Sequence, residues 1–152
     1  STYHYLSAFY PLWAGVATRE QAAALEKHLS TFDHPGGLAM SDFDSGTQWD
    51  LPYGWAPTNW LATQGLVNYG FFEDARRVSR EFTSTVRQNF LRDGTIREKY
   101  DVVNGSANVQ VATGYKSNVV GFGWTNAVYL KMTSLLETAK TGAMQAAAAG
   151  KQ

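Results

Sequence analysis

The chain has 152 residues, 44% of them hydrophobic and 14% aromatic, with 5 Trp and no Cys. This length allows one domain at most. The 13 acidic side chains balance the 13 basic ones, so no excess of Lys and Arg is available to bind nucleic acid or a membrane surface, and both are disfavoured as partners. The lack of thiols excludes disulfides and a Cys nucleophile. It leaves the compartment open between periplasmic or secreted and cytoplasmic.

Two short helices are predicted at the start of the chain. Apolar residues at spacings of three and four predict a helix that ends near Gly15, with a kink at Pro11 and a buried face made of Tyr5, Leu6, Phe9, Leu12 and Trp13. Thr18 and Gln21 have the form of a capping box, which predicts a second helix to about Leu29. Because the chain begins at Ser1 within an amphipathic segment, we expect further chain upstream.

The periodicity stops between Ser30 and Pro57, where glycines and prolines break up any regular element. Helix is predicted again from about Pro57 to Tyr69. The clearest helix runs from Glu73 to Phe90 and ends at Gly94, with an apolar face of Ala75, Val78, Phe82, Val86 and Phe90. A loop of more than 20 residues inside a compact domain tends to be functional when it is ordered.

The second half of the chain predicts an extended segment and one more helix. Residues 95–103 are extended in character, with Ile96, Glu98 and Tyr100 on one face. A last helix covers about 124–138, with apolar positions at Val128, Leu130, Met132, Leu135 and Leu136. Residues 1–140 are therefore expected to form the folded unit, and residues 141–152, rich in Ala, a flexible tail.

The long loop holds a composition that suits sugar binding. Gln48, Trp49, Asp50 and Trp55 lie within one run, and indole faces can cover the apolar face of a pyranose while an amide and a carboxylate bind its hydroxyls. The alternative is that both Trp side chains are core residues that anchor an irregular loop. The three His residues are too scattered to suggest a metal site, and no cofactor is indicated.

Two further runs carry candidate chemistry. Glu98 lies in the run Arg97–Asp101, and a carboxylate on the same face as Ile96 and Tyr100 would be partly desolvated and could act as a general base on water. The alternative is that Glu98 and Asp101 are surface partners of Arg97 and Lys99. The run Gly121–Asn126 precedes the last helix, where Thr125 or Asn126 could simply cap it.

Together these runs resemble the trehalases, the inverting glycoside hydrolases that split α,α-trehalose into two glucoses. The run Gln48–Pro57, QWDLPYGWAP, carries every fixed residue of the family signature Gln-Trp-Asp-x-Pro-x-Gly-Trp-x-Pro. Glu98–Asp101 and Gly121–Asn126 are similar to later segments of the family, in the same order. The resemblance covers most of residues 3–136.

The resemblance implies an all-α fold, an (α/α)6 toroid of which this chain is roughly the C-terminal third. It implies that Glu98 is the general base, and that the general acid is an Asp in an upstream stretch absent from this chain. The sugar pocket would be bordered by Gln48, Trp49, Asp50, Trp55, Phe122 and Trp124. The implied partners are trehalose or a related α-glucoside and the remainder of the catalytic domain, so we expect no activity from this chain alone.

One departure from the family pattern bears on specificity. The family often carries a glycine-rich loop with a Glu before the Gly-Phe-Gly-Trp-Thr-Asn run, whereas residues 112–118 here read ATGYKSN. No carboxylate occurs between Asp101 and Glu137. A related α-glucosidase, or a non-catalytic carbohydrate-binding helical domain, is therefore the alternative to a strict trehalase.

Overall fold

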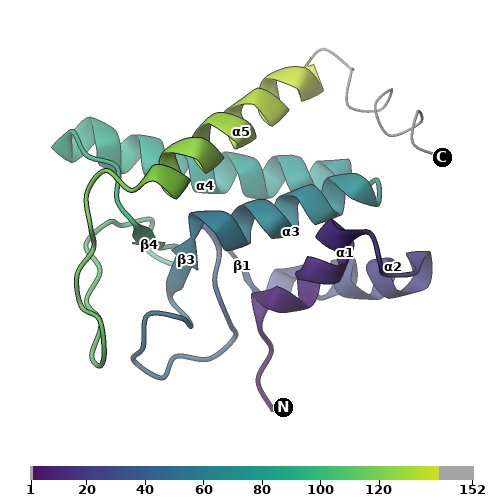
Figure 1. Cartoon of the computed structure of the whole chain (residues 1–152), viewed down its shortest axis with the longest axis horizontal. Helices are drawn as coiled ribbons and strands as arrows, with labels where there is room; N and C mark the ends of the chain where they lie inside the picture. Colours follow the sequence, from purple (N-terminus) through teal and green to yellow (C-terminus); the bar gives the residue numbers. More distant parts are fainter. Residues whose placement is uncertain (1, 141–152) are drawn as a thin grey trace.

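The computed structural model describes residues 2–140, in which helices dominate (Figure 1). The helices, with the short 3-10 turns written η, are in chain order η1 (Leu6–Phe9), α1 (Tyr10–Ala14), α2 (Arg19–Lys27), η2 (Leu29–Thr31), α3 (Ala56–Asn68), α4 (Phe72–Asp93) and α5 (Gly123–Lys140). The prediction of a mainly helical fold is confirmed for these residues. The predicted tail, 141–152, lies outside them.

The N-terminal helix forms as predicted but in two pieces. Pro11 lies in the first turn of α1, where its missing N–H costs nothing, and Gly15 ends α1 in a left-handed conformation with φ of 70°. Leu6, Phe9 and Leu12 are fully buried, whereas Tyr5 and Trp13, expected on the same face, are about half exposed. The 3-10 turn has three residues per turn rather than 3.6, which shifts the buried face along the segment.

The predicted capping box of the second helix is confirmed. The Thr18 hydroxyl accepts a hydrogen bond from the Gln21 backbone N–H at 3.2 Å, and the Gln21 side chain accepts one from the Thr18 N–H at 2.8 Å. Two of the N–H groups that a helix N-terminus leaves without partners are thereby satisfied. The helix ends at Lys27, close to the predicted end.

Short strands are the main correction to the predicted fold, because the long loop is partly extended and paired. The strands are β1 (Asp33–His34), β2 (Gly37–Leu38), β3 (Tyr53–Trp55) and β4 (Lys99–Asp101). They form two antiparallel two-stranded sheets, β1 with β2 and β3 with β4. The all-α class is therefore incomplete for this chain. The partner of β3 lies more than 40 residues away, so no local pattern announces the pairing.

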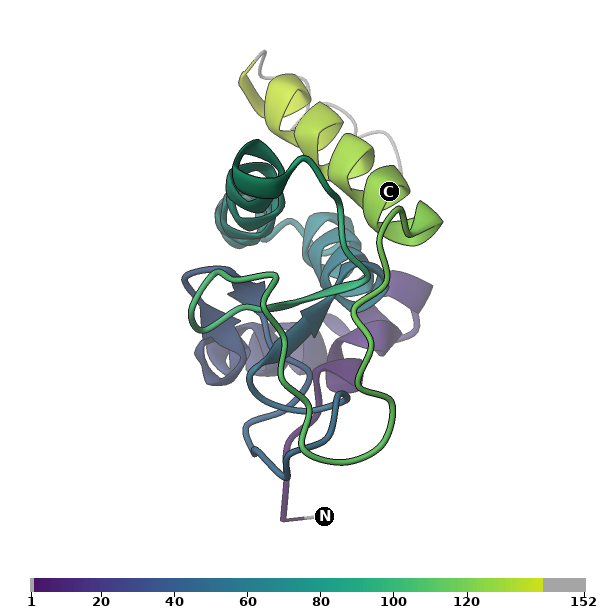
Figure 2. The ribbon, with the colours of Figure 1, turned by 90° about the vertical axis from the view of Figure 1, so that its left-hand side faces the viewer.

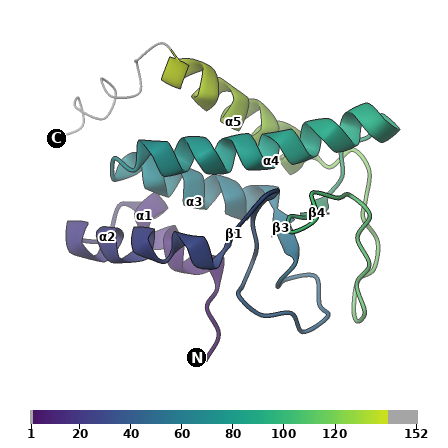
Figure 3. The ribbon, with the colours of Figure 1, turned by 180° about the vertical axis from the view of Figure 1, so that it is seen from behind.

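Helix α3 lies at the centre of the helical layer and contacts α1, α4 and α5 (Figures 1 and 3). It carries no charged side chain, as expected for a helix that is covered on several sides. At Gly65 a Cβ would lie 2.8 Å from Leu12 Cβ and 2.9 Å from the Trp13 N, so only glycine allows α1 to approach this closely. Helices α3 and α5 run in the same direction and α4 runs opposite to both.

The two longest helices each depart from the predicted buried face at one apolar residue. Helix α4 buries Ala75, Val78, Phe82 and Val86 as predicted, but Phe90 near its end is exposed. In α5, Val128 and Met132 are buried whereas Leu130 is exposed. Helix α5 begins at Gly123, so the predicted cap at Thr125 or Asn126 is wrong, because both residues already lie inside the helix.

The loops gather at one end of the helical layer. Strands β3 and β4 lie where α3 and α5 begin and α4 ends, and the loops around residues 40–52 and 105–122 extend from the same end (Figures 1 and 2). Within residues 2–140, no helix is both long and apolar enough to cross a membrane. The predicted site residues lie in three places at this end: in or next to β3, next to β4, and at the start of α5.

Candidate active site

The β3–β4 ladder is the scaffold of the candidate site. Trp55 pairs with Lys99, Gly54 with Tyr100 and Tyr53 with Asp101. Because directly opposed residues project from the same face of a ladder, this register places the Trp55 and Lys99 side chains side by side. At Gly54 a Cβ would lie 2.4 Å from Val102 Cγ1 and 2.7 Å from the Leu38 carbonyl oxygen, so this position needs a glycine for the strands to pair.

Glu98 lies just before β4, where the backbone bends. The bend lets its side chain meet that of Lys99, which strict alternation along a strand would prevent. Lys99 Nζ donates a 3.0 Å hydrogen bond to Glu98 Oε2. Glu98 is 6% exposed and Lys99 is fully buried. The alternative of a surface ion pair for these two residues is therefore wrong, and the partly desolvated position predicted for Glu98 is confirmed.

Four aromatic residues form a continuous cluster beside this pair. Trp49 and Trp55 stack with ring centroids 4.0 Å apart and 6° between their planes. Trp124 meets the edge of Trp55 at 5.6 Å, and Phe122 lies 4.5 Å from Trp124. Trp55 is 2% exposed, so it is part of the core, whereas Trp49 is 49% exposed. The structure thus brings together four predicted pocket residues from two separate runs of the chain, Gln48–Pro57 and Gly121–Asn126.

Gln48 and Asp50 hold the loop that carries Trp49. The Gln48 carbonyl oxygen accepts a 2.8 Å hydrogen bond from Trp55 Nε1. Asp50 Oδ2 accepts hydrogen bonds from the Ser45 N–H at 2.9 Å, the Ser45 hydroxyl and the Thr47 hydroxyl at 3.1 Å. Gln48 Oε1 and Asp50 Oδ1 are buried and have no hydrogen-bond partner among the described residues. Each side chain thus keeps one acceptor free for a donor from elsewhere.

The segment before α5 closes one side of the site. The Ser117 carbonyl oxygen accepts a 2.6 Å hydrogen bond from Lys99 Nζ, and Asn118 exchanges hydrogen bonds with both backbone groups of Lys99. Glu98 N–H donates to the Val119 carbonyl oxygen at 2.9 Å. The backbone of the Glu98–Lys99 pair is therefore fixed from both sides, by β3 and by residues 117–119.

Lys99, Tyr115 and Asn118 are site residues that the sequence did not single out. Lys99 Nζ lies 5.1 Å from the ring centroid of Trp55 and 4.9 Å from that of Tyr115. The sequence shows that Lys99 follows Glu98. It does not show that Lys99 is buried, because the burial depends on the pairing of Lys99 with Trp55. Tyr115 lies in residues 112–118, where the sequence departs from the family pattern, and that departure was the available signal.

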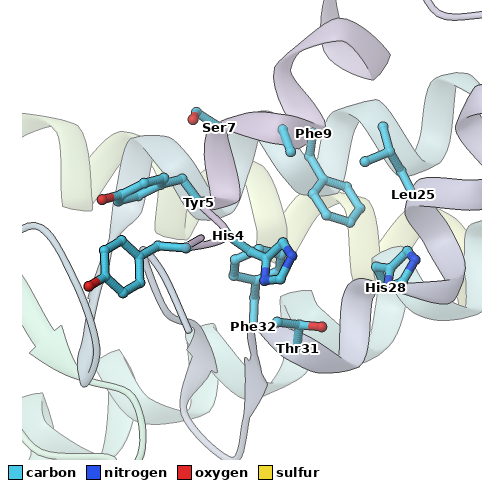
Figure 4. Close-up of a pocket in the computed structure, with 10 residues that line it drawn as sticks. His4, Tyr5, Ser7, Phe9, Leu25, His28, Thr31 and Phe32 are labelled. Atoms are coloured by element: carbon cyan, nitrogen blue, oxygen red, sulfur yellow. The ribbon is translucent and has the colours of Figure 1, made fainter. Parts of the chain in front are cut away.

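Two concave regions lie outside this cluster. A polar cavity of about 410 Å³ is lined by Tyr53, Asp101 and Gln110 among others, and burial together with the Asp101 charge raises the pKa of Tyr53. A larger and mainly apolar cavity of about 500 Å³ lies between the N-terminal segment and η2, near Phe9, Leu25 and Phe32 (Figure 4). Its lining contains His4 and His28 but no carboxylate, so it cannot supply the carboxylate base that the sequence predicts at Glu98. Among residues 2–140, no group of three His, Asp or Glu side chains could hold a metal ion.

The comparisons with known proteins concern the family and the fold of the chain. The family model described as Trehalase matches residues 1–137. The periplasmic trehalases of Salmonella paratyphi B and Salmonella newport are each 40% identical to the chain over 134 residues. The structure of the neutral trehalase of Saccharomyces cerevisiae superimposes with a TM-score of 0.74 at 34% identity and covers 96% of this chain.

A helical domain with a buried carboxylate beside a cluster of indoles has the features of a glycoside hydrolase site. The chain belongs to the trehalase family. It spans 23% of the length of the Salmonella relatives and 26% of the yeast protein.

Proposed function

We propose that the protein containing this chain is an α,α-trehalase-like hydrolase that splits trehalose into two glucoses with inversion of configuration. The observation that carries this proposal is the Glu98 carboxylate, which is buried beside the aromatic cluster and accepts a hydrogen bond from Lys99 Nζ. A carboxylate held in this way can take a proton from a water that attacks the anomeric carbon. Family membership supplies the substrate class.

The residues around Glu98 then have distinct roles. Trp49 offers the exposed ring face on which a glucose unit stacks, while the buried Trp55 supports it from behind. Phe122 and Trp124 border the same pocket. The free acceptors Gln48 Oε1 and Asp50 Oδ1 are suited to sugar hydroxyl donors, because a buried oxygen without a partner is costly in the unliganded state.

The remaining machinery lies outside residues 2–140 in this proposal. An inverting glycosidase needs an acid on the far side of the glycosidic bond, roughly 6.5 to 9.5 Å from the base. The remainder of the catalytic domain would supply this Asp and complete an (α/α)6 toroid, of which residues 1–140 form one part. Support for the toroid comes from the parallel α3 and α5 with the opposed α4, which is the alternation expected of stacked helix pairs.

A related α-glucoside is a second candidate substrate, and one observation favours it. Residues 112–118, where the sequence departs from the family pattern, hold no carboxylate, and the half-exposed ring of Tyr115 in this segment lies 4.9 Å from Lys99 Nζ. A neutral phenol hydroxyl accepts a sugar hydroxyl more weakly than the two oxygens of an ionised carboxylate do. Comparing kcat/KM for trehalose with that for maltose decides between the two substrates.

The assignment of Glu98 is tested with Glu98→Gln in the full-length protein, which keeps the shape of the side chain but cannot take a proton. We expect kcat for glucose release from trehalose to fall by about 10³-fold, the range of a lost general base, while KM stays within about threefold. Glu20→Gln on the exposed side of α2 is the control and should keep its kcat. Wild-type turnover by Glu98→Gln would contradict the assignment. Trehalose binding by calorimetry without glucose release from the wild-type protein would instead support a binding domain.

A further inference from the structure

Lys99 is a cation with no exposure to solvent. Burying an ammonium group is costly unless it is paired and hydrogen-bonded, so its contacts should explain why it is there. Its Nζ donates to Glu98 Oε2 at 3.0 Å and to the Ser117 carbonyl oxygen at 2.6 Å. Among residues 2–140, Nζ also lies over the faces of Trp55 and Tyr115, at 5.1 and 4.9 Å from the ring centroids. The charge is therefore enclosed by one carboxylate, one carbonyl and two aromatic rings.

This enclosure fixes the ammonium group independently of Glu98. The Lys99 backbone is held by Asn118, which accepts from its N–H at 3.2 Å and donates to its carbonyl oxygen at 3.0 Å. The pairing with Trp55 across the ladder sets the direction of its side chain. Since Ser117 and the two rings hold Nζ as well, the ammonium group is a fixed point against which the Glu98 carboxylate is oriented.

We propose that Lys99 is the positioning residue of the base: it holds Glu98 through Oε2 and leaves Oε1 to receive the proton of the attacking water. The inference rests on the proposed function of Glu98 and goes beyond it, because it assigns a role to a side chain that need not touch the substrate. A carboxylate with one oxygen fixed presents the other in a constant direction, and general-base catalysis depends on that direction.

The test is Lys99→Met in the full-length protein, which keeps the length and apolar character of the side chain but removes the charge and the donors. Misplacement of the base should lower kcat for trehalose about 100-fold. The sugar-binding indoles remain, so KM should stay within about threefold. Lys131→Met on the exposed side of α5 is the control and should keep both constants. Wild-type kcat in Lys99→Met would overturn the inference, as would a rise in KM without a loss of kcat.

A double-mutant cycle separates positioning from a general structural role. If Lys99 acts only through Glu98, adding Lys99→Met to Glu98→Gln should leave kcat at the level of Glu98→Gln within about threefold. A further loss of about 100-fold in the double variant would show that Lys99 contributes independently, and would overturn the inference. The double variant also carries no unpaired charge at this place, so it should fold where Lys99→Met alone is strained.

Lys99→Gln is the second variant in case Lys99→Met gives no folded protein, as judged by circular dichroism. Its amide keeps a donor for the Ser117 carbonyl oxygen but lacks the charge and the reach to fix Glu98. The same fall in kcat at constant KM is expected, and unchanged kcat would contradict the inference. If Glu98→Gln is inactive while both Lys99 variants are fully active, the positioning role fails and the proposed base stands. If Glu98→Gln is active, both the positioning role of Lys99 and the assignment of Glu98 as the base fail.

Discussion

Trp49 and Trp55 stack face to face but differ in what holds them. Trp55 is buried, and its Nε1 donates to the Gln48 carbonyl oxygen, so it belongs to the packing of the site. Trp49 covers one face of Trp55 and leaves about half of its own surface in solvent. The two alternatives drawn from the sequence are thus divided between the two residues: Trp55 is a core residue, and Trp49 has the exposure that a sugar platform needs.

Trp49→Ala in the full-length protein should therefore raise KM for trehalose about tenfold, because a ring that stacks on the sugar is lost, with little change in thermal stability. Trp13→Ala is a matched control, since Trp13 is also 49% exposed but lies at the end of α1, away from Glu98. It should leave KM unchanged. Equal effects of the two substitutions on KM would argue against a sugar platform at Trp49.

Prediction from the sequence succeeded for single residues where the chemistry was local. The amide, carboxylate and indole side chains of the run Gln48–Pro57 could be identified directly from the sequence, and Glu98 was expected on a buried face. Lys99 was not recognised as a buried group, because its burial depends on pairing with Trp55 across 44 positions of chain. The hydrogen bonds of Asp50 to Ser45 and Thr47 likewise depend on a loop shape that no periodicity encodes.

At the scale of elements, β1 and α4 are joined by a cluster of charged side chains. Arg77 of α4 donates to Asp33 of β1 at 2.9 Å and to Asp74 at 2.5 Å. Burial, a hydrogen bond to Asp33 and the charge of Asp33 raise the pKa of Glu81 to about 8, although Arg77 and Arg80 oppose the shift. Asp33 Oδ1 and Glu81 Oε2 are buried without a donor among residues 2–140, and a proton on Glu81 would supply one.

This cluster gives a pH dependence of stability. Because the pKa of Glu81 in the folded state, about 8, lies above its ordinary value of 4.5, the folded protein keeps a proton that the unfolded chain releases. Stability should thus be lost as the pH rises from about 4.5 to about 8. Glu81→Gln stays neutral and should be more stable than the wild type by about 1 to 2 kcal/mol at pH 8.5, less than the full shift implies because part of the side chain is exposed.

Thermal unfolding followed by circular dichroism at pH 5 and pH 8.5 measures this effect. Glu73→Gln is the control from the same helix, since the Glu73 side chain is 80% exposed, and it should leave the pH dependence as it is in the wild type. A Glu81→Gln protein that loses as much stability as the wild type between the two pH values would show that another group is responsible.

Elements were predictable where a local signal defines them. The capping box of Thr18 and Gln21 marked the start of α2. Gly15 and Gly94 marked the ends of α1 and α4, because glycine readily adopts the left-handed conformation that ends a helix. Strand β4 lies within residues 95–103, which were predicted to be extended, whereas β1, β2 and β3 were missed because each has only two or three residues and lies in the loop where no periodicity is visible. The start of α5 was predicted within one residue, at about 124, but the suggested cap at Thr125 or Asn126 was wrong, because both residues lie in the first turn of the helix.

At the scale of the whole molecule, α1, α3 and α5 form a layer in which α3 contacts both of the others, and α4 packs against α3 and α5. The candidate site lies at the end of this layer where α3 and α5 begin (Figure 1). Such an arrangement needs the close approach at Gly65 and the paired strands at Gly54, and both positions exclude a Cβ. The run Gln48–Pro57 thus includes a residue that shapes the fold, Gly54, as well as the residues proposed to bind the sugar.

The most direct test of the account is the anomeric form of the glucose released from α,α-trehalose, followed from the first turnovers by proton NMR with the full-length protein. Inversion at one anomeric carbon converts it to the β form, while the leaving glucose keeps its α form. We therefore predict equal amounts of α- and β-glucose at early times, before mutarotation, and no early β-glucose from Glu98→Gln. Release of α-glucose alone would indicate retention, and no release at all would indicate a protein that does not hydrolyse trehalose; either result contradicts the account.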